Sequence, residues 1–443
     1  MIIDFSKIKS EKLRLSILGL VVFIMSPLQL LAKNWDNHQR SGDTFAYDLA
    51  KKYLDSCPKE AILITNGDNF TFPLWYLQEV EHYRSDVRVV NYDLLNLSYY
   101  IDKLKNKNLS SNPLKISFSY ENYREGNPKL YPLKVDTKES VDLALLFQFL
   151  NNDSTKITWN GKQQHYIPGD IFQIKVDTTQ NIFANIDKKR LNAQFTSQIT
   201  WKFSKEFYQL NDVIGMNLIL ENMQERPICF LVNGNREHYL GFQNYLVHTG
   251  FVEQLLPLER RDKEMNPKIV NTLESNLLFQ KDSITFKNSD AFIKSENIEY
   301  AQTIIRRNDY FLAQALVEEN HIEEAKKVLD KSFHNLPDVK VPYKQFAFAL
   351  GKLYYKIGQK EKGNEVCLKS LNNIWDELQW ITSFNSSANP IINVKQAVKL
   401  KEMYEQMIVQ LEPFNPEKAL EEKQKAIEFN AYFTKWHIRN WPY

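Results

Sequence analysis

This chain of 443 residues contains few glycines and prolines, and neither sign of charge is in clear excess. It has 13 glycines and 16 prolines, which argues against a fibrous or low-complexity protein. Lysine and arginine number 56 against 54 aspartates and glutamates, so the net charge is +2, with no long run of one sign. Because nucleic-acid binding needs a basic stripe, the composition argues against DNA or RNA as partners. Hydrophobic residues make up 43% of the chain, enough for two or three packed domains.

Catalytic and metal-binding signatures are missing as well. The sequence has no GxSxG, P-loop, GxGxxG or HExxH pattern. We therefore assign no catalytic residue, no cofactor and no metal. Cys57, Cys229 and Cys367 lie far apart and show no zinc-ligand spacing. We expect buried free thiols, while one disulfide remains open in an oxidising compartment.

One apolar run is long enough to cross a membrane. Residues 15–32 carry no charge and are bounded by Arg14 and Lys33. A helix of this length spans about 27 Å, close to the roughly 30 Å of a bilayer core. Basic residues precede the run and mixed charges follow it, so the positive-inside rule places residues 1–14 in the cytoplasm. We expect a single-pass inner-membrane protein with its bulk in the periplasm; a cleaved signal peptide and a buried soluble helix are the alternatives.

Residues 33–257 are expected to form an extracytoplasmic α/β domain. Helical spacing at residues 44–56, 72–83 and 98–105 alternates with short apolar runs at residues 61–65 and 87–91. This order predicts a Rossmann-like βαβ start with parallel strands. Residues 106–131 are polar and loop-like. The later part indicates a mixed sheet with an inserted β-rich segment, with strands expected at residues 156–159, 165–167, 171–176, 198–203, 227–232 and 251–256 and a helix at residues 210–223.

The turn after the first predicted strand supplies the first candidate binding site, made of Asn66, Gly67, Asp68 and Asn69. In parallel α/β units the ligand crevice lies at the carboxyl ends of the strands. Asp68 offers a carboxylate there, and Gly67 permits a tight turn. The same four residues are also typical of a strand-to-helix turn with an N-cap, so both interpretations stand.

A second polar group follows the apolar run and contains Asp36, His38 and Arg40. With Asp43, these residues bring two carboxylates and a histidine together, a set that can hold a metal. Their spacing matches no known ligand motif. A polar rim at the membrane exit, with Trp35 at the interface, explains them better, and we keep the three as binding candidates.

The chain ends in a region that we expect to be all helical. After a linker at residues 258–295, residues 296–443 contain two stretches that resemble tetratricopeptide repeats. Ala313 and Gly351 occupy equivalent small-residue positions, 38 residues apart (351 minus 313) rather than the usual 34. Further helices are expected at residues 394–411 and after Asn415. Such an array presents a concave binding surface or packs only on its own α/β domain.

Several segments together resemble a known family: residues 34–42 (NWDNHQRSG), residues 61–91 (with TNGDNFTFPLWYLQEV and DVRVVN), residues 225–227 and residues 239–241. They are similar to the C-terminal half of a bacterial multi-pass membrane family of unknown function (domain-of-unknown-function family 2723). That family in turn resembles protein O-mannosyltransferases of the GT-C type. The resemblance implies a split or truncated relative, because the multi-pass half that would carry the catalytic acid has no counterpart here.

Three functions follow from these observations. The resemblance implies an accessory extracytoplasmic part of a membrane glycosyltransferase system, whose partner is a multi-pass glycosyltransferase-like subunit or an acceptor protein. The alternative is a membrane-anchored helical-repeat scaffold for protein–protein interaction. The third is an independent enzyme with a pocket around Asp68. The sugar, the lipid carrier and the acceptor do not follow from the sequence.

Overall fold

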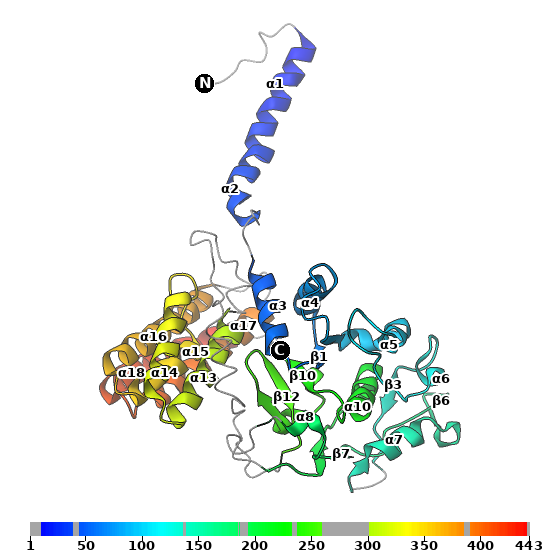
Figure 1. Ribbon diagram of the computed structural model, residues 1–443. Coiled ribbons are helices and arrows are strands. Elements are labelled where there is room, and N and C mark those ends of the chain that lie inside the picture. The colour runs from blue at the N-terminus through cyan, green and yellow to red at the C-terminus, as the bar shows by residue number, and fades with distance from the viewer. Residues whose placement is uncertain are drawn as a thin grey trace.

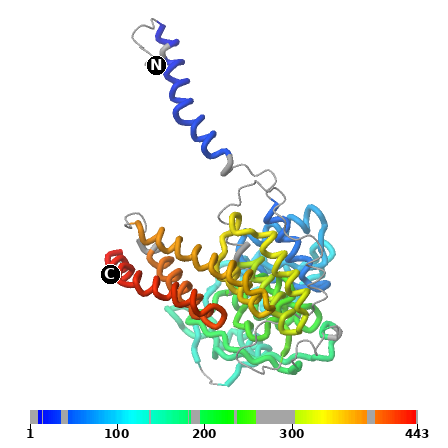
Figure 2. Tube along the Cα trace, turned by 90° about the vertical axis from the view of Figure 1, so that its left-hand side faces the viewer, coloured from blue at the N-terminus to red at the C-terminus, as the bar shows by residue number. Residues whose placement is uncertain are grey.

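The computed structural model describes residues 10–38, 44–135, 139–184, 186, 194–232, 237–258, 301–384 and 390–440. It has three parts: an N-terminal apolar helix, a mixed α/β region and a helical C-terminal region (Figure 1). In both ribbon and tube views the apolar helix projects away from the other two parts (Figures 1 and 2). The expected linker lies outside the described residues, apart from Leu258.

The N-terminal helix is longer than the apolar run alone indicates. It comprises α1 (Glu11–Phe23), a π-helical turn η2 (Ile24–Leu28) and α2 (Gln29–His38). Pro27 lies inside the π-helical turn, and such turns commonly accommodate an interruption of the regular hydrogen bonding. The segment Glu11–Trp35 is long and apolar enough to cross a membrane, and none of its most apolar stretch is buried. A single-pass membrane protein is consistent with this finding.

The α/β region is built on a five-stranded sheet of order β11-β12-β10-β1-β2. Strand β1 (Ile62–Thr65) pairs in parallel with both β2 (Arg88–Asn91) and β10 (Ile228–Leu231), as the βαβ pattern predicted. Strand β12 (Val252–Leu255) is antiparallel to β10 and to β11 (Leu246–His248). The sheet is therefore mixed, with the three parallel strands β10, β1 and β2 side by side and β2 at one end. Strand β11 was not predicted.

Alternating side chains of the central strands face two separate cores, which is the geometry of a strand covered on both faces. Ile62, Ile64 and Phe230 join the core beneath α10 (Leu210–Asn222) and α5 (Ser98–Leu104). Leu63 and Cys229 point the other way, into the core formed with α3 (Phe45–Ser56) and α4 (Asp68–Glu79). All three cysteines of the chain are buried and free.

The inserted β-rich segment consists of small sheets. Strand β3 (Leu130–Pro132) pairs with β9 (Phe207–Gln209), and β4 (Val141–Asp142), β7 (Ile171–Lys175) and β8 (Gln198–Lys202) form a second sheet. The prediction of a strand at residues 165–167 is wrong. The second strand of this hairpin is β6 (Lys162–Gln164), which pairs with β5 (Ile157–Trp159), whereas Ile167 forms only an isolated bridge to Leu133. Between the strands lie short helices and α7: η3 (Asp93–Asn96), α6 (Tyr120–Tyr123), α7 (Leu143–Leu150), η4 (Asp153–Thr155), α8 (Asn181–Ala184), η5 (Glu237–Tyr239) and η6 (Phe242–Tyr245).

The C-terminal region is helical, as expected. After the π-helical turn η7 (Ala301–Ile305) come α13 (Arg306–Glu318), α14 (Ile322–Asn335), α15 (Gln345–Lys356), α16 (Lys360–Ser383), α17 (Pro390–Leu411) and α18 (Pro416–Asn440). Gly351 allows α15 and α16 to approach closely, because a Cβ there would lie 2.7 Å from the Cys367 sulfur. The small residue identified in the sequence is therefore a packing position.

The start of the helical region is packed on the α/β region. Ile304 and Ile305 belong to the same core as α3 and α4. Arg307 donates to Glu253 of β12 at 2.8 Å, and His248 Nε2 of β11 lies 2.8 Å from Asn308 Oδ1. These contacts hold the start of α13 against β11 and β12.

Lowering the pH from 7 to 5 is expected to destabilise the protein through buried histidines. Burial, and then the charge of Arg307, lower the pKa of His248 to about 4, and burial lowers the pKa of His238 to about 4. Between about pH 6.5 and 4 the unfolded chain therefore binds protons that the folded chain does not. Stability then falls as pH falls, by about 2 kcal/mol per histidine at pH 5. Asp309 changes the stability in the opposite direction. Burial raises its pKa to about 6, so its contribution to the free energy of unfolding is largest at low pH and is lost as the pH rises through 6.

The measurement is the melting temperature at pH 7 and pH 5. His248→Gln should make the difference between the two values smaller. His321→Gln serves as the control, since His321 is about half exposed and pairs only with Glu324. An unchanged pH slope in His248→Gln would contradict the assignment.

Candidate functional site

The carboxyl edge, where β1, β2 and β10 end at Thr65, Asn91 and Leu231, is the place at which parallel strands hold ligands. Thr71 ties the first two strand ends together there. Its hydroxyl oxygen lies 2.8 Å from that of Thr65 and accepts a hydrogen bond from Asn91 Nδ2 at 3.1 Å. The Thr71 hydroxyl itself donates to the carbonyl of Gly67 at 2.9 Å. Thr65, Thr71 and Asn91 are fully buried, so this network fixes the edge rigidly.

Two turns at the carboxyl edge are joined to each other through Asp93. The Gly67 N–H donates to Asp93 Oδ2 at 3.0 Å, which links the turn after β1 to the turn after β2. Asn91 Oδ1 in turn accepts from the N–H groups of Asp93 and Leu94, at 2.9 and 3.1 Å. Gly67 has φ +80°, a left-handed value that favours glycine. The sequence therefore needs glycine at this point of the turn.

The four residues predicted as a binding loop are divided by the structure. Asn66 is buried, Gly67 is the N-cap of α4, and Asp68 and Asn69 form the exposed start of that helix. The helix begins four residues earlier than residue 72, where the sequence placed it. Pro73 thus lies beyond the first turn, where its missing N–H removes one helical hydrogen bond. The strand-to-helix turn is therefore present, with Gly67 at the N-cap position and no side-chain cap, and the binding interpretation stays a prediction.

Asp68 and Asp93 are the exposed carboxylates of this arrangement. Each follows a different parallel strand, and the bond between Gly67 and Asp93 holds the two turns in register. Carboxylate oxygens accept hydrogen bonds from hydroxyl groups, and the Asn69 amide can both donate and accept. The edge can therefore recognise a ligand rich in hydroxyl groups. Asp93 was not singled out from the sequence, although its place directly after a predicted strand could have indicated it.

A buried ionic cluster beneath the edge was also missed. Asp212 is fully buried and accepts hydrogen bonds from Lys205 Nζ at 2.7 and 3.0 Å and from the Tyr92 hydroxyl. Its Oδ2 also accepts from the Gln209 N–H at 2.8 Å, completing a capping box at the start of α10. Burial, and then the charge of Asp212, raise the pKa of Tyr92. The Gln209-to-Asp212 spacing was the available signal, but it indicates a helix start and not a site.

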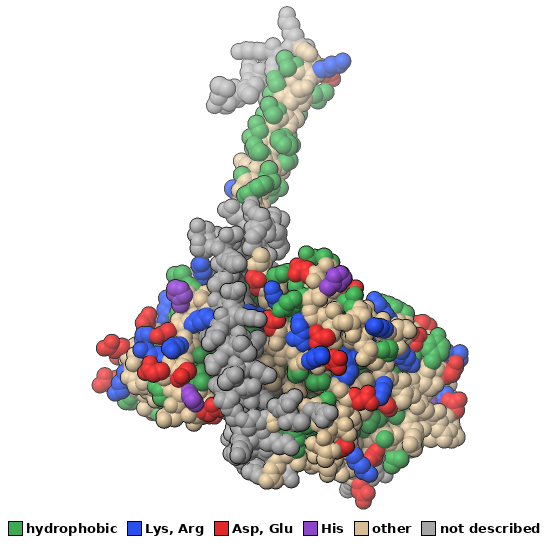
Figure 3. Space-filling model, in the orientation of Figure 1, with side chains coloured by type: hydrophobic (Ala, Val, Ile, Leu, Met, Phe, Trp, Pro, Cys, Tyr) green, Lys and Arg blue, Asp and Glu red, His purple; other side chains and the backbone are tan. Residues whose placement is uncertain are grey.

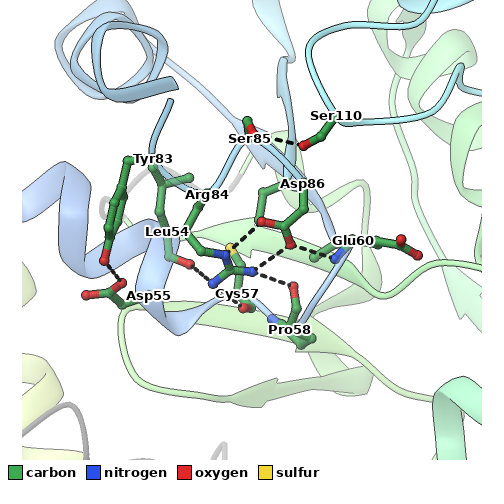
Figure 4. Close-up of polar contacts among 12 residues, drawn as sticks. Leu54, Asp55, Cys57, Pro58, Glu60, Tyr83, Arg84, Ser85, Asp86 and Ser110 are labelled. Atoms are coloured by element: carbon green, nitrogen blue, oxygen red, sulfur yellow. Dashed lines mark hydrogen bonds and ion pairs between the residues drawn. The ribbon is translucent and has the colours of Figure 1, made fainter. Parts of the chain in front are cut away.

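The opposite edge of the sheet is held by arginines that bind backbone (Figure 4). Arg84 donates to the carbonyls of Leu54, Cys57 and Pro58 at 2.7, 3.0 and 3.1 Å and pairs with Asp86 at 2.9 Å. Asp86 also accepts from the Glu60 N–H at 2.9 Å. All these groups satisfy one another, so this edge is structural.

Two segments that carried the family resemblance are structural as well. Arg226 donates to the Glu60 carbonyl at 2.7 Å and to the Ser111 hydroxyl at 3.1 Å. Gly241 has φ +85°, and a Cβ there would lie 2.9 Å from the Lys202 carbonyl oxygen. These residues hold neighbouring segments of the α/β region together, and they contribute no group to the carboxyl edge.

The second predicted group is not tested by the structure and stays a prediction. Asp36 and His38 lie in α2, but their side chains lie outside what the structure describes, and Arg40 lies outside the described residues. Within the part of the chain that the structure describes, no group of three or more histidine, cysteine or acidic side chains could hold a metal ion.

Comparison with known proteins gives one match. No curated protein and no solved structure matches the chain. The model of the TMEM260-associated domain 2 matches residues 46–274, which is 229 of 443 residues and runs from α3 past β12. This family differs from family 2723, and the match does not confirm the glycosyltransferase resemblance. The chain belongs to the family defined by the TMEM260-associated domain 2.

Proposed function

We propose that the chain is the extracytoplasmic accessory part of a membrane glycosyltransferase system, in which the carboxyl edge helps to bind a hydroxyl-rich sugar or acceptor. The observation that carries the proposal is the pair of exposed carboxylates, Asp68 and Asp93, on two turns locked by the Gly67–Asp93 bond. The motif resemblance to O-mannosyltransferase-like proteins suggested this function, and the family match does not confirm it. The positive-inside pattern of residues 1–14 favours the periplasmic side of an inner membrane.

The apolar helix limits how far the α/β region can lie from the membrane. Six residues, 39–44, connect the end of α2 at His38 to the start of α3 at Phe45. A connection of this length spans at most about 25 Å. A membrane helix at Glu11–Trp35 therefore keeps the α/β region close to the bilayer, within reach of a membrane-embedded active site.

A membrane-anchored scaffold is the second candidate. Exposed apolar side chains on the helical region favour it: Trp380 is 63% exposed on α16, and Leu420 and Ile427 are 69% and 55% exposed on α18. If the region is a tetratricopeptide-like array, these positions offer a surface for a peptide.

Affinity purification from detergent-solubilised native membranes distinguishes the two functions. We expect the C-terminally tagged chain to co-purify with a multi-pass glycosyltransferase-like protein in stoichiometric amount. The variant Asp68→Asn/Asp93→Asn should keep this partner but lose glycan transfer by the complex. Asp153→Asn, an exposed carboxylate remote from the carboxyl edge with a side chain 82% exposed, is the matched control. A chain that elutes alone, or only with soluble proteins, contradicts the accessory function and favours the scaffold.

A further inference from the structure

The outer face of α4 carries an apolar stripe that no part of the described chain covers. Phe72, Tyr76 and Val80, at the end of the helix, are 51%, 51% and 61% exposed. They are spaced four residues apart, so they lie along one side of the helix. The Phe72 and Trp75 rings stack with their centroids 5.6 Å apart, which holds the Phe72 side chain in place. Single exposed apolar residues are ordinary, whereas an aligned set on one helix indicates a contact surface.

This stripe lies next to the point where the α/β region is tethered. Tyr47, in the first turn of α3, donates its hydroxyl to Glu81 Oε2 at 2.8 Å, just past Val80. The tethered end of α3 and the C-terminal end of α4 are therefore in contact. Figure 1 shows α3 and α4 at the end of the molecule from which the apolar helix departs, and α7 at the far end. In Figure 3, hydrophobic side chains lie at this end among acidic and histidine side chains.

We propose that the Phe72–Tyr76–Val80 stripe rests in the interface of the same bilayer that holds the apolar helix. The connection of six residues keeps α3 within about 25 Å of the membrane helix, so the neighbouring face of α4 is the one presented to lipid. Aromatic rings with a polar handle favour the headgroup level of a bilayer. Trp35, 58% exposed near the end of the membrane segment, is a second aromatic anchor at the same level.

The charge of the α4 side chains indicates which lipids this stripe can contact. Its sequence, DNFTFPLWYLQE, contains two acidic residues and no lysine or arginine. An electrostatic attraction to anionic headgroups needs basic side chains. The contact therefore forms through aromatic and apolar insertion, and it should be as strong on neutral phosphatidylcholine as on anionic lipid and insensitive to salt.

The test uses the full chain in phosphatidylcholine vesicles with and without brominated phosphatidylcholine, which quenches nearby fluorophores. A thiol-reactive fluorophore is attached at Val80→Cys, at Leu145→Cys or at Leu20→Cys. Leu145 on α7 is a matched control, because it is an exposed apolar residue with the same 61% exposure at the far end of the molecule. Labelled wild type supplies the background, since its three cysteines are buried. Tyr76→Cys is a second position on the stripe.

We expect quenching at Leu20, Val80 and Tyr76 and none at Leu145. The inference depends on the membrane anchoring in the proposed function but not on the glycosyltransferase. Quenching at Leu20 with none at Val80 and Tyr76 overturns the stripe's lipid contact and leaves the anchoring intact. No quenching at Leu20 overturns both. If Val80 is unquenched in vesicles yet shielded from labelling in native membranes, a protein covers the stripe and the inference is wrong.

Discussion

Replacing Arg306 with methionine is expected to lower the free energy of unfolding by about 3–5 kcal/mol. The Arg306 side chain is fully buried at the start of α13. It donates to the carbonyls of Leu336, Val341 and Pro342 at 2.6, 2.9 and 3.2 Å. Its guanidinium also lies 4.8 Å from the centre of the Tyr343 ring. Methionine fills the space of the arginine stem but leaves three inward-facing carbonyls without their donor.

Denaturant unfolding of the detergent-solubilised chain, followed by tryptophan fluorescence, measures this loss. Arg306→Lys should recover only part of the stability, because one ammonium group cannot reproduce the planar fork of donors. Arg124→Met is the control, since Arg124 is 53% exposed and pairs only with Glu121, and its effect should stay within about 0.5 kcal/mol. If Arg306→Met were as stable as Arg124→Met, the carbonyls would have to find other donors, and the proposed role of the arginine would be wrong.

The second large effect is expected at Asp212. Changing this residue to alanine removes the partner of the Lys205 ammonium, the acceptor of the Tyr92 hydroxyl and the cap of α10. The loss of this buried acceptor costs about 3 kcal/mol, because the Tyr92 hydroxyl, the start of α10 and the Lys205 ammonium, whose side chain is 30% exposed, lose their partner together. We expect Asp212→Ala to lose that much stability and to loosen the packing of α10 on β1 and β10.

A double-mutant cycle separates the ion pair from the cap. Lys205→Met alone leaves the Asp212 carboxylate buried without its cation, so it should be strongly destabilising. In Lys205→Met/Asp212→Ala no charge remains, and the loss should be much smaller than the sum of the single losses. Additive losses in the thermal unfolding of the four proteins would show that Asp212 acts only as a helix cap.

The sequence indicated the central sheet because its strands are short, continuous apolar runs. Such runs at residues 61–65, 87–91, 227–232 and 251–256 correspond to β1, β2, β10 and β12. Strands β9 and β11 have three residues each, and a pattern of three is too short to separate from a loop. Helix α4 begins before the predicted residue 72, because Gly67 forms its N-cap and the Thr71 hydroxyl donates to the Gly67 carbonyl.

The candidate site could be predicted only in part, for a different reason. Asn66 to Asn69 were found because position after a strand is a local signal. Asp93 became relevant only through its bond to Gly67, 26 residues earlier. The Tyr92–Asp212 contact joins residues 120 positions apart. Pairings of this kind follow from the three-dimensional arrangement of the sheet, and no spacing rule along the chain contains them.

The arginines at the edge of the sheet opposite the carboxyl edge also determine which substitutions this family can accept there. Arg84 binds the carbonyls of Leu54, Cys57 and Pro58, and Arg226 binds that of Glu60. A backbone carbonyl is present whatever the side chain, so substitution at the accepting positions leaves these bonds in place. For these carbonyl contacts, selection acts on the arginines and not on the side chains of the accepting positions. Among relatives that share this edge, Arg84 and Arg226 should persist while the residues at positions 54, 57, 58 and 60 vary, and Asp86, whose carboxylate pairs with Arg84, should persist with it.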